Sequence, residues 1–219
     1  MMYQVVEYMW VSSLLRPSKN DVLRAIFIAL AAVSQLAGCV HHSASWVAPI
    51  SKTSEAVVPL SDGTSVLGTG FFIEPQLIVT SAHVHKEGAT LYFESSDEKL
   101  RLMHLVWLDK DLDLATFRVS DYESSHVLSV SSVDPKVGTP IVALGFPLGA
   151  HLTATAGIVS ADLPSGLLQT DVVVFHGNSG GPIVDRRGDA IGVVTFKGDL
   201  GISFAVRLQH LHEFMPTLR

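Results

Sequence analysis

The sequence contains a single cysteine, Cys39, among its 219 residues. Without a second thiol the chain cannot form an internal disulfide, so its stability must come from packing. Charged residues are also few, at 16%, whereas hydrophobic residues reach 47%. This composition excludes an intrinsically disordered chain and is typical of a globular core. The length suits one substantial domain with a short appendage, or two very small domains.

The sequence also lacks a cluster of basic residues. Lys and Arg number 15 against 21 Asp and Glu, and the basic residues are scattered along the chain. Proteins that bind nucleic acids carry a basic stripe or patch, so we expect no nucleic-acid partner. A metal-binding envelope protein is a further alternative because there are ten histidines. However, His41-His42 and the His83/His85 pair lack Cys or carboxylate partners at ligand spacing, so we expect no metal and no cofactor.

A membrane-spanning apolar run is absent as well. The unbroken core of the one strongly apolar segment, residues 25–33, is shorter than the roughly 20 residues that cross a bilayer. Basic residues precede this segment and small residues end it, which is the pattern of an export signal. Its last residues, Leu36-Ala37-Gly38-Cys39, resemble the bacterial lipobox, in which the signal is cut before a cysteine that becomes lipid-modified. A buried helix with an incidental cysteine is the alternative.

These features predict a lipoprotein signal peptide over residues 1–38 and a lipid on Cys39. The lipid would hold the protein on a membrane at the periplasmic face of a bacterial cell envelope. Residues 39–54 are rich in Ser, His, Thr and Pro and show little periodicity. We therefore expect a tether over residues 39–54 and a folded domain over 55–219.

From residue 55 onward, short apolar runs rich in Val, Ile, Phe and Thr alternate with turn signals such as Ser-Asp-Gly at 61–63. The predicted strands are residues 56–60, 70–73, 77–80, 89–93, 102–108, 114–119, 140–144, 153–160, 171–175, 183–184, 190–196 and 201–205. About a dozen short strands without helical crossovers indicate an all-β sandwich or barrel. One helix is predicted at the C-terminus, where Leu208, Leu211 and Met215 recur at helical spacing and Phe214 widens the apolar stripe.

The segment His-Gly-Asn-Ser-Gly-Gly-Pro at residues 176–182 is the most specific motif. A serine hydroxyl such as that of Ser179 becomes a good nucleophile only when a base takes its proton. Gly177 allows a tight turn, which can direct the N–H groups of Gly177 and Ser179 to one spot, where they would stabilise an oxyanion. We include the intervening Asn178 in this predicted oxyanion hole. A glycine-rich hairpin turn without catalytic function is the alternative.

A base and an orienting acid must come from elsewhere in the chain. His83 follows the predicted strand 77–80 and a turn of small residues, although a lone histidine in a β protein is often structural. The acid could be Asp109, Asp111 or Asp113, because alternate residues of an extended segment project to the same face. Asp113 directly precedes an apolar run that would draw it inward.

The order His83, Asp113, Ser179 is that of the chymotrypsin type, and it differs from the order in subtilisin and the α/β-hydrolases. Within that clan the chain resembles the HtrA/DegP-type trypsin-like serine proteases over roughly residues 55–206. The matching stretches are 68–73 with 80–84, 111–115, 144–149 with 157–161, and 169–171 through 177–182 with 191–193 and 201–206. The resemblance selects Asp113 as the acid. It also implies an all-β fold, a double six-stranded β-barrel of the chymotrypsin/trypsin type with a C-terminal α-helix.

The function implied by the resemblance is that of a serine endopeptidase. It would hydrolyse peptide bonds of unfolded or flexible envelope proteins through an acyl-enzyme, so its partners would be protein or peptide substrates. The alternative is a catalytically silent binding or scaffold module with the same fold. HtrA proteins usually continue into one or two PDZ domains, whereas this sequence predicts a protease domain only. Residues 174–176, Val-Phe-His, also depart from the family pattern directly before the Gly-Asn-Ser motif.

Arg/Lys specificity needs an acid six residues before the serine, and that position is Val173. Cleavage after basic residues is therefore disfavoured. By resemblance, Val174 forms one wall of the specificity pocket and Thr195-Phe196-Lys197 form the other, which implies an apolar pocket for small or medium aliphatic side chains. Lys197 could instead favour an acidic substrate residue. His176 is either an exposed loop residue or a contact to the substrate.

Overall fold

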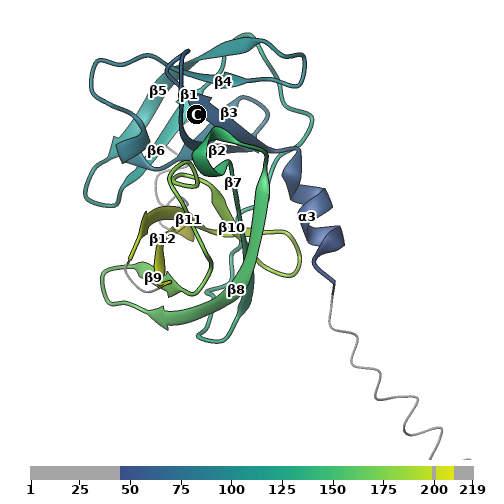
Figure 1. Cartoon of the computed structure of the whole chain (residues 1–219), viewed down its shortest axis with the longest axis vertical. Helices are drawn as coiled ribbons and strands as arrows, with labels where there is room; N and C mark the ends of the chain where they lie inside the picture. Colours follow the sequence, from purple (N-terminus) through teal and green to yellow (C-terminus); the bar gives the residue numbers. More distant parts are fainter. Residues whose placement is uncertain (1–44, 199–200, 210–219) are drawn as a thin grey trace, which may run out of the picture. The chain divides into compact units, whose positions relative to one another are not determined.

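Six short strands close into a barrel in the first half of the computed structural model, which describes residues 45–198 and 201–209 (Figure 1). The strands are β1 Val57–Ser61, β2 Val66–Glu74, β3 Leu77–Thr80, β4 Leu91–Glu94, β5 Leu100–Asp109 and β6 Leu114–Arg118. Their order around the barrel is β1-β2-β3-β6-β5-β4, and all neighbours are antiparallel. Closure pairs both edges of every strand in this barrel.

A second barrel of six strands follows in the chain (Figure 1). Its strands are β7 Pro140–Gly145, β8 Thr153–Asp162, β9 Leu167–Thr170, β10 Pro182–Val184, β11 Ala190–Lys197 and β12 Ser203–Arg207. They close in the order β10-β11-β12-β9-β8-β7. The all-β, double six-stranded barrel predicted from the sequence is therefore confirmed. The predicted C-terminal helix falls mainly on residues after 209, which lie outside the described residues. The predicted signal peptide and Cys39 lie outside the described residues as well.

The strands near the centre of the molecule are buried on both faces. In β2, Phe72 packs inside the first barrel, whereas the adjacent Phe71 belongs to a separate apolar cluster that also includes residues of the second barrel. In β7, Ile141 and Val142 are divided in the same way between the interior of the second barrel and this shared cluster. Two-sided burial explains why these strands read as continuous apolar runs rather than as an alternating pattern.

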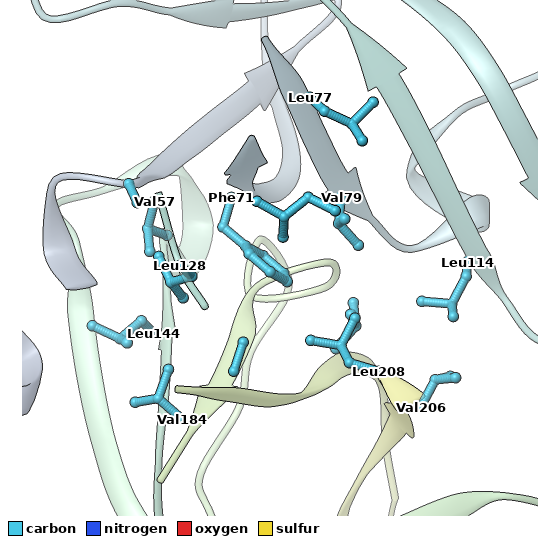
Figure 2. Packing of buried hydrophobic residues seen from close by; sticks show 14 of the residues in the cluster. Val57, Phe71, Leu77, Val79, Leu114, Leu128, Leu144, Val184, Val206 and Leu208 are labelled. Carbon is cyan, nitrogen blue, oxygen red and sulfur yellow. The ribbon is translucent and has the colours of Figure 1, made fainter. Parts of the chain in front are cut away.

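The shared cluster joins the two barrels. Figure 2 shows this cluster, in which Phe71 and Val79 of the first barrel are joined by Leu144 and Val184 of the second. Phe71 is fully buried, and burying a side chain of this size contributes about 1.5–3 kcal/mol. The catalytic candidates lie on loops around this junction, so its packing sets the distance between residues from different barrels.

The predicted strand over residues 171–175 is wrong, because this segment belongs to neither barrel. Its side chains do alternate: Val172 and Val174 are buried, whereas Val173 and Phe175 are half-exposed. The strand that the sequence did not predict is β9, directly before it, which pairs with β8 and β12.

Side chains replace a neighbouring strand along this segment. Ser203 Oγ donates to the carbonyl of Val172 at 3.0 Å, and Thr155 Oγ1 donates to the carbonyl of Val173 at 2.9 Å. These hydroxyls satisfy carbonyls that would otherwise accept ladder bonds. The segment therefore stays extended without being part of a sheet.

The tether predicted over residues 39–54 also needs correction. Residues 39–44 lie outside the described residues, but Val47–Ser54 form an α-helix, α3, that packs against the protein. The side chains on its packed side recur at helical spacing: Trp46, Pro49, Ile50 and Thr53. The many Ser, Thr and Pro residues concealed this pattern, because they are typical of loops. The compact unit that contains both barrels therefore includes residues from Trp46 onward, and the boundary predicted at residue 55 is too late.

The helix α3 is attached to the turn between β10 and β11. The guanidinium of Arg186 lies over the Trp46 ring at 3.9 Å from its centroid. Lys52 Nζ donates to the carbonyl of Arg187 at 3.1 Å and lies 3.5 Å from Asp189 Oδ1. The chain then enters β1, so α3 contacts the second barrel immediately before the first barrel begins.

Candidate active site

His83 lies on a single turn of 3-10 helix, Ala82–Val84, directly after β3. Ala82 and Val84 are buried and anchor the turn, whereas the His83 side chain is 47% exposed. The side chains on both sides of the histidine thus hold it at the surface next to the junction of the barrels. The backbone N–H of His83 also donates to Asp113 Oδ1 at 3.0 Å.

Asp113 lies in the turn between β5 and β6, not in an extended segment as the sequence suggested. Asp109 accepts hydrogen bonds from the backbone N–H groups of Asp111 and Leu112 and thereby closes this turn. Asp113 itself has a left-handed backbone with φ of 56°, which aspartate tolerates better than most residues. Of the three aspartates considered, Asp113 is the one that contacts His83.

The His83 ring and the Asp113 carboxylate form a close pair. His83 Nδ1 lies 2.8 Å from Asp113 Oδ2 and 3.0 Å from Oδ1. Since a carboxylate only accepts hydrogen bonds, Nδ1 carries the proton, and Nε2 of a neutral ring is left as an acceptor. This is the tautomer that a general base needs.

Opposing effects act on the pKa of Asp113. Burial raises it, but hydrogen bonds from the His83 ring, the Thr195 hydroxyl and the His83 backbone N–H together outweigh burial. The net result is a pKa below the usual value of an aspartate. The carboxylate is therefore ionised at neutral pH and favours a proton on Nδ1 of His83.

Thr195 of β11 contacts both Asp113 and Ser179. Its Oγ1 donates to Asp113 Oδ2, and its carbonyl accepts from Ser179 Oγ at 3.4 Å. The sequence assigned Thr195 to the pocket wall alone, and the structure adds these two contacts. A threonine in a predicted strand gave no signal for them.

Ser179 lies in a loop whose backbone requires glycine. Gly177 has φ of 97°, and a Cβ built on it would lie 2.2 Å from the carbonyl oxygen of Phe146. The carbonyl of His176 accepts a hydrogen bond from Leu148 N at 2.7 Å. Because a peptide unit is planar, with C=O and N–H in opposite directions, this bond turns the Gly177 N–H away from Leu148.

The predicted oxyanion hole contained three residues, and the structure separates them. The N–H of Asn178 donates to the carbonyl of Phe175 at 3.0 Å, so it is not available to a substrate. Within residues 45–198 and 201–209, the N–H groups of Gly177 and Ser179 have no acceptor. Asn178 is therefore removed from the predicted oxyanion hole, and the N–H groups of Gly177 and Ser179 remain as its two candidate donors.

A family model described as a trypsin-like peptidase domain matches residues 68–193. The chain belongs to the trypsin-like peptidase family. The matched region contains His83, Asp113 and Ser179, together with most of both barrels.

Several serine proteases are similar to this trypsin-like peptidase domain. Serine protease HTRA4 of Mus musculus is 37% identical over 161 residues, which are 68% of this chain and 33% of that protein. Mitochondrial serine protease HTRA2 of Drosophila virilis is 37% identical over 166 residues, 69% of this chain and 39% of that protein. The chain thus spans about a third of the length of the curated relatives it matches.

Among solved structures, a serine endoprotease from Yersinia pestis is similar to the chain. The TM-score is 0.70 at 26% sequence identity, and the match covers 80% of this chain and 66% of that one. This likeness agrees with the two-barrel fold of the trypsin-like peptidase family.

A pocket of about 490 Å³ opens beside Ser179 of this trypsin-like peptidase domain. Its described lining comprises His83, Val174, Phe175, His176, Ser179, Val194 and Thr195. Val173, six residues before the serine, is 51% exposed and is not among these described lining residues. Among the described lining residues none is acidic, and the buried walls are Val174 and Val194.

The other predicted pocket residues have different outcomes. Val174 and Thr195 line the pocket as predicted. Phe196 and Lys197 belong to β11, but their side chains lie outside the description, so their predicted roles stay predictions. His176 is an exposed loop residue that also lines the pocket, so its contact to the substrate stays a prediction.

A second pocket of about 380 Å³ shares His83 and Thr195 with the first. It extends to Leu112 and to Leu167 at the start of β9. The described part of the trypsin-like peptidase domain contains no cluster of three or more His, Cys, Asp or Glu side chains that could hold a metal ion. Within the same residues, no helix has the length and apolar character needed to span a bilayer.

Proposed function

We propose that the chain is a serine endopeptidase in which Ser179 is the nucleophile, His83 the general base and Asp113 the residue that orients the base. The observation that carries this proposal is the 2.8 Å contact of His83 Nδ1 with Asp113 at a pocket that Ser179 also lines. This contact leaves Nε2 as a proton acceptor beside the serine.

The reaction begins when Ser179 Oγ leaves the Thr195 carbonyl and attacks the carbonyl carbon of the scissile peptide bond. Nε2 of His83 takes the hydroxyl proton, and Asp113 stabilises the imidazolium that forms. The C–N bond then breaks, the leaving amine takes the proton from Nε2, and an acyl-enzyme remains. A water molecule repeats the sequence, donates its proton to Nε2 and releases the carboxylic acid with Ser179 restored.

The oxyanion of each tetrahedral intermediate is stabilised by the N–H groups of Gly177 and Ser179. Neither group has an acceptor within the described residues, so no hydrogen bond of this part of the protein must break when the oxyanion forms. Donors that are oriented in advance stabilise the transition state more than the ground state.

The pocket supports cleavage after small or medium aliphatic residues. Its buried walls, Val174 and Val194, are apolar, and among its described lining residues there is no carboxylate that would pair with Arg or Lys. The adjoining second pocket accommodates further residues of an extended substrate segment. We therefore propose unfolded or flexible protein segments as substrates. Profiling the cleavage of a peptide library tests this specificity, with aliphatic residues expected directly before the cleaved bond.

A fluorophosphonate probe tests the catalytic assignment. It is expected to label the wild-type chain and to lose labelling in Ser179→Ala, while labelling persists in Ser125→Ala, which removes an exposed serine away from the site. Circular dichroism establishes that each variant is folded. A folded wild-type chain that neither reacts with the probe nor cleaves peptides would instead be a catalytically silent binding module.

The location of the protein is a separate part of the proposal. The basic, apolar and small-residue pattern before Cys39 supports a lipid anchor on that residue, at the periplasmic face of a bacterial membrane. Mass spectrometry of the protein purified from its host is expected to find a lipidated N-terminal Cys39. An unmodified thiol, or retained residues before it, contradicts the anchor without affecting the catalytic proposal.

A further inference from the structure

Three buried hydroxyl residues lie where the first barrel meets the loop of Ser179. Thr69 of β2, Thr80 of β3 and Ser81 after it are all fully buried. Ser81 Oγ donates to the carbonyl of Val194 at 2.8 Å, which joins the first barrel to β11. None of the three belongs to the proposed catalytic set, and Thr69 has the most contacts with the catalytic loop.

Thr69 holds this loop at two points. Its backbone N–H donates to the carbonyl of Ser179 at 2.8 Å, and its Oγ1 donates to the carbonyl of Gly177 at 2.6 Å. A single residue of the first barrel therefore contacts both residues whose N–H groups form the proposed oxyanion hole.

The hydroxyl of Thr69 is itself fixed in direction. Oγ1 also accepts from Phe146 N at 3.0 Å, and the Thr69 carbonyl accepts from Thr80 Oγ1 at 2.7 Å. Because the hydroxyl donates one hydrogen bond and accepts another, it cannot rotate without breaking a buried hydrogen bond, which costs free energy.

The carbonyl of Gly177 belongs to the peptide unit that lies between the two oxyanion donors. Its oxygen is held by Thr69, and the N–H of Asn178 at its other end is held by Phe175. The unit is planar, so these two bonds fix its rotation. That rotation sets the relative direction of the Gly177 and Ser179 N–H groups on either side.

We propose that Thr69 is a positioning residue for the oxyanion hole, acting through the hydrogen bond from its hydroxyl to Gly177. This inference rests on the proposed endopeptidase function. Thr69 touches no reacting atom, so its loss acts on the chemical step and leaves substrate binding in the pocket unchanged. The expected signature is a fall in kcat without a matching rise in KM.

Thr69→Val tests the inference because it removes the hydroxyl and keeps the shape, while Thr69→Ser restores the hydroxyl. Removal of one oxyanion donor lowers kcat by about 10²–10³-fold in known enzymes. Misdirected donors are expected to cost at least about tenfold, with KM within about twofold of wild type. Thr69→Ser is expected to stay within about threefold of wild-type kcat.

Thr116→Val is the matched control, because Thr116 is also fully buried in the first barrel but its Oγ1 has no partner within the described residues. Its kcat is expected to equal that of wild type. If Thr69→Val does not fold, as judged by circular dichroism, Thr69→Ala carries the test, since it removes the hydroxyl without a possible clash.

Different outcomes separate the two proposals. A folded wild-type chain without peptidase activity or fluorophosphonate labelling overturns the proposed function, and the role of Thr69 with it. An active wild type whose Thr69→Val variant keeps kcat within about threefold overturns only the role of Thr69. Equal falls in kcat in Thr69→Val and Thr69→Ser also overturn it, because packing would then be responsible. A fall in kcat/KM that comes from a raised KM overturns it too, because substrate binding would then be responsible.

Discussion

Replacement of Gly177 by alanine tests whether the shape of the loop that carries Ser179 limits the proposed peptidase reaction. The backbone φ of 97° is unfavourable for alanine, with a cost of about 1–2 kcal/mol. The added Cβ would also lie 2.2 Å from the carbonyl oxygen of Phe146 and 3.0 Å from Leu148 N. Both neighbours are backbone atoms, so the loop itself must move by about 1 Å to restore a normal contact.

A displacement of about 1 Å at a catalytic group costs roughly 10²-fold in rate, which corresponds to about 2.7 kcal/mol in the activation free energy. We therefore expect Gly177→Ala to lower kcat by about 100-fold in a steady-state peptide-cleavage assay. The free energy of unfolding, measured with urea, is expected to fall by at least the cost of the backbone strain.

Gly138→Ala is the matched control for this strain. Gly138 has φ of 86°, but a Cβ there would meet nothing within 4 Å. This variant is expected to lose about 1–2 kcal/mol of stability and to keep wild-type kcat. The reasoning is refuted if Gly177→Ala retains kcat within about threefold of wild type, or if the two variants lose activity equally.

Two further changes test the acid and the core. Asp113 has a lowered pKa, so its pairing stabilises the fold fully above the unfolded-state pKa of about 4 and is lost as pH falls through the lower folded-state pKa. Thermal unfolding between pH 5 and pH 2 is therefore expected to depend less on pH in Asp113→Asn than in wild type, and equal slopes would contradict this. Phe71→Ala is expected to lower the free energy of unfolding by about 3–5 kcal/mol in urea titrations, because Phe71 is fully buried at the junction of the barrels. Leu105→Ala, at a side chain that is 47% exposed, serves as its control and should change stability by no more than about 0.5 kcal/mol.

Most of the fold could be predicted because short apolar runs and turn signals are local features. The error at residues 171–175 has a physical origin, since this segment alternates between buried and exposed side chains as a strand does. What distinguishes it from a strand is the source of its hydrogen bonds, Ser203 and Thr155, which are distant in sequence. Such partners cannot be recognised from a local pattern.

The same distinction between local features and partners distant in sequence applies to the candidate site. His83 and Ser179 lie within motifs that carry their own turn chemistry, so the sequence could identify them. The contacts of Thr69 and Thr195 depend on how the two barrels meet, and a threonine in a strand is ordinary. The removal of Asn178 from the oxyanion hole follows from a single hydrogen bond to Phe175, which no residue pattern encodes.

The attachment of α3 to the turn between β10 and β11 has a consequence for biosynthesis. Lys52 and Asp189 are separated by 137 positions in the chain. At about 5–20 residues per second, a ribosome needs roughly 7 to 27 s to make that stretch. The first barrel uses strands that are contiguous in sequence, so it can close during this interval, whereas α3 must wait for its partner. The helix that comes first among the described elements is therefore among the last to reach its final contacts.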